Sequence, residues 1–143
     1  MNEESPLYTL KEVLQPRSVA ILGASRAPHK WGHVAAKQLI EGGFPGEIYL
    51  ITPSTPEMLG RMTYRSMRDV PGPVDLAVIS TAFQHVVQAV DDCIEHGVKG
   101  IVIITAGFSE TGTEGRALEQ QLVARCHEHG IRMIGSNCMG IYV

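Results

Sequence analysis

One stretch near the N-terminus constrains the fold of this chain more than any other: Ser18-Val-Ala-Ile-Leu-Gly-Ala-Ser25, followed by Pro28-His-Lys30 and Trp31-Gly32. Its four apolar residues run into a loop of small residues, and an apolar-patterned helix is expected to begin soon after. The first amides of a helix lack intrahelical partners and the helix dipole favours an anion, so a strand, a small-residue loop and a helix N-terminus together form a phosphate site. The motif therefore predicts a ligand that is held by its phosphates.

Apolar segments recur along the chain at starts about 25 to 32 residues apart, which is close to the length of one βαβ unit. They cover residues 19–22, 48–51, 76–79, 101–104 and 132–134. Most are continuous apolar runs, as expected for strands that are covered on both faces. The pattern predicts an α/β fold, a single Rossmann-like domain with a doubly wound parallel sheet of about five strands.

Helical spacing of apolar residues predicts helices over about 31–41, from Phe83 to Ile94 and from about Thr113 onward. The glycines that follow these helices are expected to adopt the left-handed C-cap conformation: Gly42-Gly43, Gly97 and Gly130. The interval 53–73 is different, because it is rich in proline and glycine and has no apolar period. There we expect at most one helical turn near 56–59 and a short extended piece near Tyr64.

Composition narrows the classes of function. The chain has 143 residues and a net charge of −3, whereas a nucleic-acid surface normally carries a basic excess. It also lacks the run of about 18 apolar residues that a membrane span needs, so neither nucleic acid nor a membrane is an expected partner. The acidic N-terminus lacks the apolar core of a secretory signal, and the three cysteines have no metal-like spacing. We expect a cytoplasmic protein with reduced thiols and no bound metal.

Ligands of an open parallel sheet bind outside the carboxyl ends of the strands, where the strand order reverses. All five predicted strands end in small, polar or glycine residues: Gly23-Ala-Ser25, Thr52-Pro-Ser54, Ser80-Thr-Ala82, Thr105-Ala-Gly-Phe108 and Gly135-Ser-Asn-Cys138. These strand ends are expected to form one shallow edge that is rich in backbone amides, and this edge is the predicted site.

The dinucleotide fingerprint tests which phosphate ligand fits. It requires G-x-G-x-x-G and an acidic residue at the end of the second strand. Here Ser25 stands in place of the second glycine and Thr52 in place of the carboxylate, which counts against a standard NAD site. Lys30 is the best candidate for a charged contact and Arg26 the next, and they suit a ligand with extra phosphate. An NAD(H)-binding domain of a redox or sensor protein stays an alternative, as does an interaction domain with a vestigial phosphate loop.

Five motifs that span nearly the whole chain carry a family resemblance: Pro16-Arg-Ser-Val-Ala-Ile-Leu-Gly-Ala-Ser25, Gly42-Gly-Phe44, Val74-Asp-Leu-Ala-Val-Ile79, Ala106-Gly-Phe-Ser-Glu-Thr-Gly112 and Gly135-Ser-Asn-Cys-Met-Gly140. In combination they resemble the N-terminal CoA-binding domain of NDP-forming acyl-CoA synthetases, the succinyl-CoA synthetase α-subunit superfamily. The same module opens the bacterial protein lysine acetyltransferases, where Pro28-His-Lys30 and Thr52-Pro53 also fit. A regulatory CoA-binding module of such an acetyltransferase is therefore a further alternative.

The resemblance implies coenzyme A as the ligand and distributes its contacts along the predicted edge. The phosphates would lie at Gly23, Ala24 and Ser25 with Lys30 as the counter-charge, the adenosine at Thr52 and Pro53, and the pantetheine at Ser80 and Thr81. Ala106, Gly107 and Phe108 would line the channel through which the thiol reaches the chemistry, and Asn137 and Cys138 would lie on the last loop.

The chain departs from the family pattern at two positions. The family often has Asn-Pro-Lys after the second strand, and Thr52-Pro-Ser54 lacks that lysine. The last loop is usually Gly-Pro-Asn-Cys, and Ser136 replaces its proline, which is expected to loosen the loop.

In the family that the chain resembles, phosphate passes through a histidine on the next domain and nucleotide is used by an ATP-grasp domain. No nucleophile–base–orienter set is visible in the 143 residues themselves. We therefore expect residues 1–143 to be a CoA-binding domain from a larger ADP- or NDP-forming synthetase, without catalytic residues of its own. The phospho-histidine and ATP-grasp domains or subunits would be its partners, and a homodimer is left open.

Overall fold

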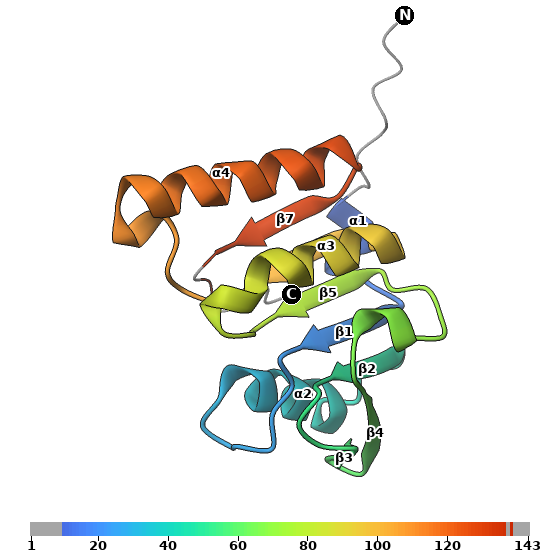
Figure 1. The fold of residues 1–143 in the computed structure, drawn as a ribbon. Coiled ribbons are helices and arrows are strands. Elements are labelled where there is room, and N and C mark those ends of the chain that lie inside the picture. The colour runs from blue at the N-terminus through green and yellow to red at the C-terminus, as the bar shows by residue number, and fades with distance from the viewer. Residues whose placement is uncertain (1–9, 137, 139–143) are drawn as a thin grey trace, which may run out of the picture.

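The apolar runs form the central strands of a mostly parallel sheet in a computed structural model, which describes residues 10–136 and 138. All five predicted strands are present: β1 (Ser18–Leu22), β2 (Glu47–Ile51), β5 (Leu76–Ile79), β6 (Gly100–Ile103) and β7 (Arg132–Gly135). Two further short strands bring the sheet to seven, in the order β3-β4-β2-β1-β5-β6-β7 (Figure 1). The predicted α/β class is confirmed, with two strands more than expected.

The strand order reverses at β1. The chain passes from β1 to β2 on one side and later returns to β5 on the other, so that Ile21 is paired with Leu50 and also with Val78. A right-handed crossover places its helix on one face when the chain moves in one direction and on the opposite face when it moves in the other. The carboxyl end of β1 is therefore the switch point at which ligands of this architecture bind.

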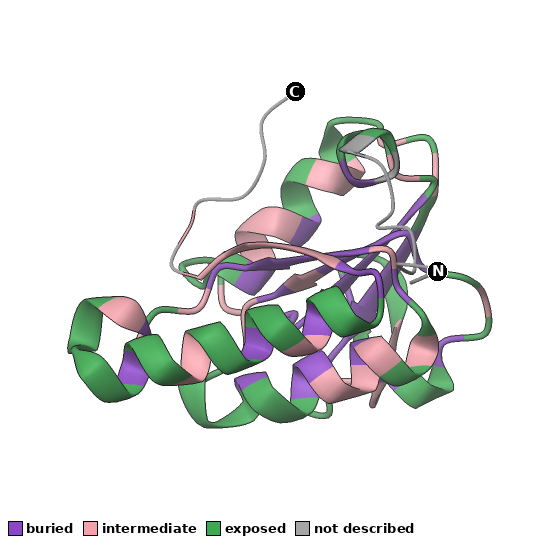
Figure 2. Ribbon diagram, turned by 90° about the horizontal axis from the view of Figure 1, so that it is seen from above, coloured by how far each residue is buried: buried purple, intermediate pink, exposed green. Residues whose placement is uncertain are grey.

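The helices cover both faces of the sheet as these crossovers require (Figures 1 and 2). The face that packs with α2 (Trp31–Glu41) also carries α1 (Leu10–Leu14), and the other carries α3 (Val86–His96) and α4 (Thr113–Glu128). Single 3-10 turns, η1 (Met67–Asp69), η2 (Phe83–His85) and η3 (Ser109–Thr111), lead into or connect these elements. Buried residues concentrate in the strands and on the helix sides that face them (Figure 2).

The proline-rich interval forms a hairpin and not the expected helical turn. Its strands are β3 (Glu57–Met58) and β4 (Arg61–Tyr64), and β4 extends the sheet by pairing in parallel with β2. The turn between them places Leu59 at φ 49° and Gly60 at φ 72°, as in the two-residue turns that suit hairpin twist. The helical turn near 56–59 was therefore a wrong prediction, whereas the extended piece near Tyr64 is confirmed.

Glycines end the helices largely as predicted. Gly97 and Gly130 have φ values of 83° and 72°, in the left-handed region. After α2 the left-handed residue is Gly43, at φ 73°, because Gly42 keeps a right-handed conformation and continues the last helical turn.

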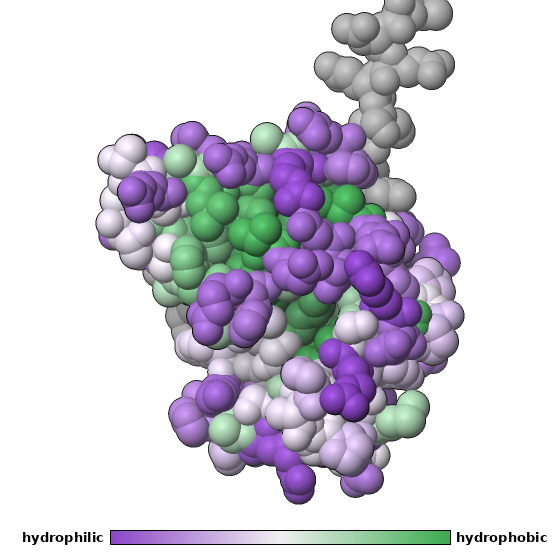
Figure 3. All heavy atoms as spheres, in the orientation of Figure 1, coloured by the Kyte–Doolittle hydropathy of each residue, from purple (hydrophilic) through white to green (hydrophobic). Residues whose placement is uncertain are grey.

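The face formed by α3 and α4 carries apolar side chains between the two helices (Figure 3). Val87 on α3 and Val123 on α4 are among the exposed large apolar residues. No helix in the described part of the chain combines the length and the apolar character needed to cross a bilayer.

Candidate functional site

Two glycines bring the loop after β1 against its neighbours. Gly23 has φ 89°, and a Cβ placed there would lie 2.7 Å from the amide nitrogen of Thr81. Gly32, in the first turn of α2, is buried, and a Cβ there would lie 2.0 Å from the carbonyl oxygen of Gly23. The pair allows the helix N-terminus to pack directly on the loop, as the last glycine of a dinucleotide fingerprint does.

Some backbone amides of this loop and of the helix that follows it donate hydrogen bonds within the chain, and others have no intrahelical acceptor. The amides of Gly23 and Ala24 both donate to the carbonyl oxygen of Ile51, at 3.1 and 3.2 Å, and the Ala24 side chain lies in the core. Lys30 is the N-cap of α2 and makes no side-chain cap. The amides of Trp31 and Gly32 therefore point out of the first helical turn without intrahelical partners. The anion-binding potential lies at the start of α2 more than at Gly23 and Ala24.

A pocket of about 450 Å³ opens beside Lys30, over the ends of β5 and β6. It is lined by His29, Lys30, Trp31, Ser80, Thr81, Ala82, Ile104, Thr105 and Ala106. Lys30 is exposed and forms no salt bridge with another described residue. The Oγ1 atom of Thr81 is buried and has no hydrogen-bond partner in the described part of the chain. This Lys30 pocket thus combines a cation, an unsatisfied hydroxyl and apolar walls.

The loops around the Lys30 pocket are held by hydrogen bonds to the backbone. Ser80 Oγ donates to the carbonyl oxygen of Leu22 at 3.2 Å, and Thr105 Oγ1 donates to that of Thr81 at 2.7 Å. The strand-end loops after β1, β5 and β6 are therefore tied together, so that the pocket is formed before any ligand enters. Ser80 and Thr81 lie at the strand end that the sequence indicates. Trp31 and Ala82 were named only as parts of the first motif and of this strand end, and Ile104 was not singled out for the site.

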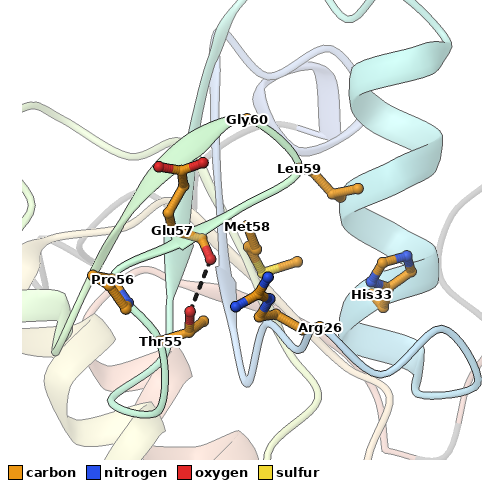
Figure 4. A pocket seen from close by; sticks show the side chains of 8 residues that line it. All are labelled: Arg26, His33, Thr55, Pro56, Glu57, Met58, Leu59 and Gly60. Carbon is orange, nitrogen blue, oxygen red and sulfur yellow. Dashed lines mark hydrogen bonds between the residues drawn. The ribbon is translucent and has the colours of Figure 1, made fainter.

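A second pocket, of about 490 Å³, lies on the other side of the loop, between α2 and the β3–β4 hairpin. Arg26, His33 and residues 55–60 line it (Figure 4). Met58 is buried, and His33 Nδ1 lies 2.9 Å from the carbonyl oxygen of Ser25, which fixes the ring against the loop. Arg26 and Lys30 therefore line separate pockets.

Thr52 and Pro53 differ in what they present to a ligand. Thr52 is buried, and its Oγ1 is 2.8 Å from Ser54 Oγ, so its side chain holds the turn after β2. Pro53 and Ser54 are exposed. The pocket next to them is lined by the following segment, residues 55–60. Only its proline and its glycine, Pro56 and Gly60, distinguished that segment in the sequence.

Ala106 and Gly107 lie on the surface of the loop after β6, but Phe108 does not. Phe108 is fully buried and packs edge to face on Phe83 with a centroid separation of 5.0 Å. Its position gives no support to the expectation that its side chain lines a channel. The Glu110 carboxylate accepts hydrogen bonds from the amides of Gly107 and Phe108, and the bond from Gly107 is the main cause that lowers the pKa of Glu110.

The last loop is tied down at the residue that replaces the family's proline. The amide and the Oγ atom of Ser136 donate to Glu119 Oε1 at 3.2 and 2.7 Å, and these bonds lower the pKa of Glu119. The expectation that Ser136 loosens this loop is therefore wrong for the described residues. Cys138 is half-buried and its thiol donates to the carbonyl oxygen of Ile103 at 3.3 Å. Asn137 lies outside the described residues.

The described residues contain no cluster of three or more His, Cys, Asp or Glu side chains that could hold a metal ion. Cys93 and Cys126 are buried in the core, where burial raises the pKa of the Cys126 thiol to about 11. Protonated buried thiols are poor nucleophiles.

The fold and the pockets together define a class: a doubly wound α/β domain whose switch point carries a helix N-terminus, two cations and two flanking pockets, at the place where ligands bind in this architecture. The model of the CoA binding domain family matches residues 17–143. The chain belongs to this CoA-binding domain family.

Several of its relatives are named as CoA ligases or acetyl-CoA synthetases. It is 45% identical over 126 residues to the alpha subunit of the ADP-forming acetate–CoA ligase II of Pyrococcus furiosus, a match that covers 88% of this chain and 27% of that subunit. With the ADP-forming acetate–CoA ligase of Methanocaldococcus jannaschii it shares 43% identity over 134 residues, 94% of this chain and 18% of that protein.

The acetyl-coenzyme A synthetase 1 of Ca. Korarchaeum cryptofilum, solved with phosphate and ADP, has a similar structure. The TM-score is 0.85 and the identity 40%, over 90% of this chain and 27% of that one. The chain thus spans less than a third of the length of these relatives. The comparisons favour the acyl-CoA synthetase interpretation over the NAD(H) and acetyltransferase alternatives.

Proposed function

We propose that this chain binds coenzyme A at the carboxyl edge of its sheet, as the CoA-binding domain of an ADP-forming acyl-CoA synthetase. One observation carries the proposal: α2 begins after Lys30 with amides that have no intrahelical partner, and Lys30 and Trp31 line a pocket with Thr81, whose hydroxyl has no partner among the described residues. A diphosphate fits the amides and the cation, because both favour negative charge at the same point.

The parts of CoA would occupy the two pockets in order. The diphosphate would lie between them, at Trp31, Gly32 and Lys30. The pantetheine arm has amide and hydroxyl groups separated by methylenes, which suits a Lys30 pocket that alternates hydroxyls with Trp31, Ala82 and Ile104. The adenosine would occupy the pocket of Arg26 and the β3–β4 hairpin.

The binding free energy that CoA needs is larger than any one of these contacts supplies, so they must act together. A helix N-terminus contributes about 0.3–2 kcal/mol to anion binding, whereas micromolar affinity corresponds to about 8 kcal/mol. The remaining free energy would come from Lys30, from the Thr81 hydroxyl and from apolar burial in the two pockets.

The chain's part in the reaction would be to hold CoA and orient its thiol toward chemistry that takes place elsewhere. The resemblance assigns the phosphoryl-carrying histidine and the ATP-grasp site to further domains or subunits, which would be its partners. We therefore propose no catalytic residue within residues 1–143.

Calorimetric titration of the 143-residue chain with CoA and with NADH tests this function. We expect CoA to bind and NADH not to bind, because no carboxylate stands at the end of β2. Lys30→Ala should weaken CoA binding about tenfold, which is about 1.4 kcal/mol. Lys37→Ala is the matched control, since Lys37 lies exposed on the same helix and pairs with Glu41 at 4.0 Å. Binding of NADH alone, or of neither ligand, would contradict the proposal.

A further inference from the structure

We infer that Arg26 recognises the 3′-phosphate of the CoA ribose, and that Lys30 serves the diphosphate and not this group. The inference rests on the proposed function, because it assigns the parts of one ligand to the two cations of the site. It names the residue that separates CoA from nucleotides that lack a phosphate on the ribose.

The first support is that Arg26 and Lys30 line different pockets. Arg26 leaves the β1–α2 loop on the side of β2, where it lines the pocket formed with the hairpin, and Lys30 lines the pocket over β5 and β6. The loop lies between the two pockets. A ligand whose diphosphate lies at the start of α2 therefore extends in opposite directions toward the two side chains.

The second support is the character of the Arg26 pocket. It offers buried Met58, Pro56 and Leu59 as apolar contacts for a base, and Thr55 and His33 as polar ones. Leu59 has φ 49°, a conformation that costs a residue with a Cβ about 1 kcal/mol or more. Glycine or asparagine would fit this turn at a lower cost. The chain has leucine there instead, and this places an apolar side chain at the rim of the pocket.

The third support is charge. Among the residues that line this pocket, Arg26 is the only permanent cation, and it forms no salt bridge with a described residue. The one carboxylate of the pocket, that of Glu57, points away from the Arg26 guanidinium (Figure 4).

The fourth support is the chemical fit between the 3′-phosphate and the guanidinium of Arg26. A guanidinium presents parallel N–H donors that fit two phosphate oxygens. In dinucleotide-binding folds of this architecture, an arginine near the end of the second strand accommodates a phosphate on the ribose. Arg26 reaches that region from the β1–α2 loop, and it faces the pocket that would receive the adenosine.

Three ligands and three variants test the inference. CoA, dephospho-CoA and adenosine 3′,5′-bisphosphate are titrated into the wild-type chain, Arg26→Gln, Lys30→Gln and the control Arg65→Gln, whose arginine is exposed outside both pockets. The wild type should bind CoA about tenfold more tightly than dephospho-CoA. Arg26→Gln should abolish that preference and leave dephospho-CoA affinity within about twofold.

The other variants separate the two cations. Lys30→Gln should weaken CoA and dephospho-CoA by the same factor and so preserve the preference, and Arg65→Gln should change neither. Adenosine 3′,5′-bisphosphate should bind the wild type and lose affinity in Arg26→Gln.

Two results would overturn the inference while leaving the proposed function intact: CoA preference that survives Arg26→Gln, or preference that is lost in Lys30→Gln. A wild-type chain that binds neither CoA nor dephospho-CoA would instead overturn the proposed function itself.

Discussion

The two edges of the central sheet differ in whether particular polar groups find a partner within the described part of the chain. At the amino edge, Asp75 is nearly buried, and its carboxylate accepts from the amide of Arg17 at 2.8 Å and pairs with Lys99 Nζ at 3.2 Å. Its own amide donates to Ser18 Oγ at 2.9 Å. At the carboxyl edge, Arg26 and Lys30 form no salt bridge within the described residues, and Thr81 Oγ1 has no partner there.

The contrast separates stability from binding. Buried polar groups are normally paired, because an unpaired one costs about 1–3 kcal/mol. The amino edge follows this rule inside the chain. The carboxyl edge keeps groups whose partners would come from a ligand, and for this reason the site is assigned to it. Substitutions at the two edges should therefore change different quantities.

The largest effect is expected for Gly32→Ala. This substitution should reduce both stability and CoA binding, because Gly32 contributes to folding and to the site. The added Cβ would lie 2.0 Å from the Gly23 carbonyl oxygen, so the loop and α2 must move apart. We expect the free energy of unfolding in urea to fall by about 3 kcal/mol, with loss of CoA binding.

Gly43→Ala is the control for Gly32→Ala, since nothing lies within 4 Å of its added Cβ. It should cost only the left-handed conformation, about 1 kcal/mol, and leave CoA binding unchanged. Equal losses of stability in the two variants would refute the close contact of Gly32 with Gly23.

Asp75→Asn should lower the free energy of unfolding without changing the affinity for CoA. It removes the charge that faces Lys99 and weakens the bond from the Arg17 amide, which should cost about 2 kcal/mol because the pair is only partly buried. Urea unfolding measures the loss, and calorimetry of the folded variant should give the wild-type affinity for CoA. A changed affinity would show that the two edges are coupled.

Ser136→Ala tests a part of the carboxyl edge whose polar side chains are paired within the chain. Loss of the Oγ bond to Glu119 should cost about 1 kcal/mol at neutral pH. Because these bonds lower the pKa of Glu119 below 4.5, their stabilisation is fully present above that pH and is lost as the pH falls through the lowered value. Urea unfolding at a series of pH values should show the variant and the wild type converging in acid. A difference that persists below the lowered pKa would rule out Glu119 as the partner that matters.

Leu59→Asn should have the smallest effect and sharpen the comparison by moving stability and binding in opposite directions. Asparagine tolerates the left-handed conformation, so the chain should become more stable by about 0.5 kcal/mol. Loss of the apolar rim of the Arg26 pocket should weaken CoA binding about threefold. Thermal unfolding and calorimetry check the two parts. Unchanged binding would mean that no base contacts Leu59.

Local patterns in the sequence predicted most of the sheet. Continuous apolar runs such as Ile101–Ile104 leave little choice but a strand buried on both faces, and Gly97 marks the end of α3. The β3–β4 hairpin was missed because β4 is fixed by pairing with β2, a non-local contact, and because Leu59-Gly60 is an unusual hairpin turn. Its proline-rich sequence has the character of a loop.

The sequence indicated which loops carry the candidate site residues but not the contacts that those residues make. Gly23 and Ser80 lie at the switch point because they directly follow β1 and β5, and Lys30 lies there because α2 begins beside them. Capture of the Gly23 and Ala24 amides by Ile51 depends on the register between β1 and β2, and burial of Phe108 depends on its contact with Phe83. Neither relation can be read from residues that are neighbours in the sequence.

The central claim, that the carboxyl edge binds and the amino edge does not, is tested most directly by amide NMR shifts of the 143-residue chain during titration with CoA. We predict shifts concentrated at Trp31, Gly32, Thr81 and Ala106 and at the Arg26 pocket, with Arg17, Asp75 and Lys99 unchanged. Shifts that centre on the amino edge, or on the outer surface of α4, would contradict the account.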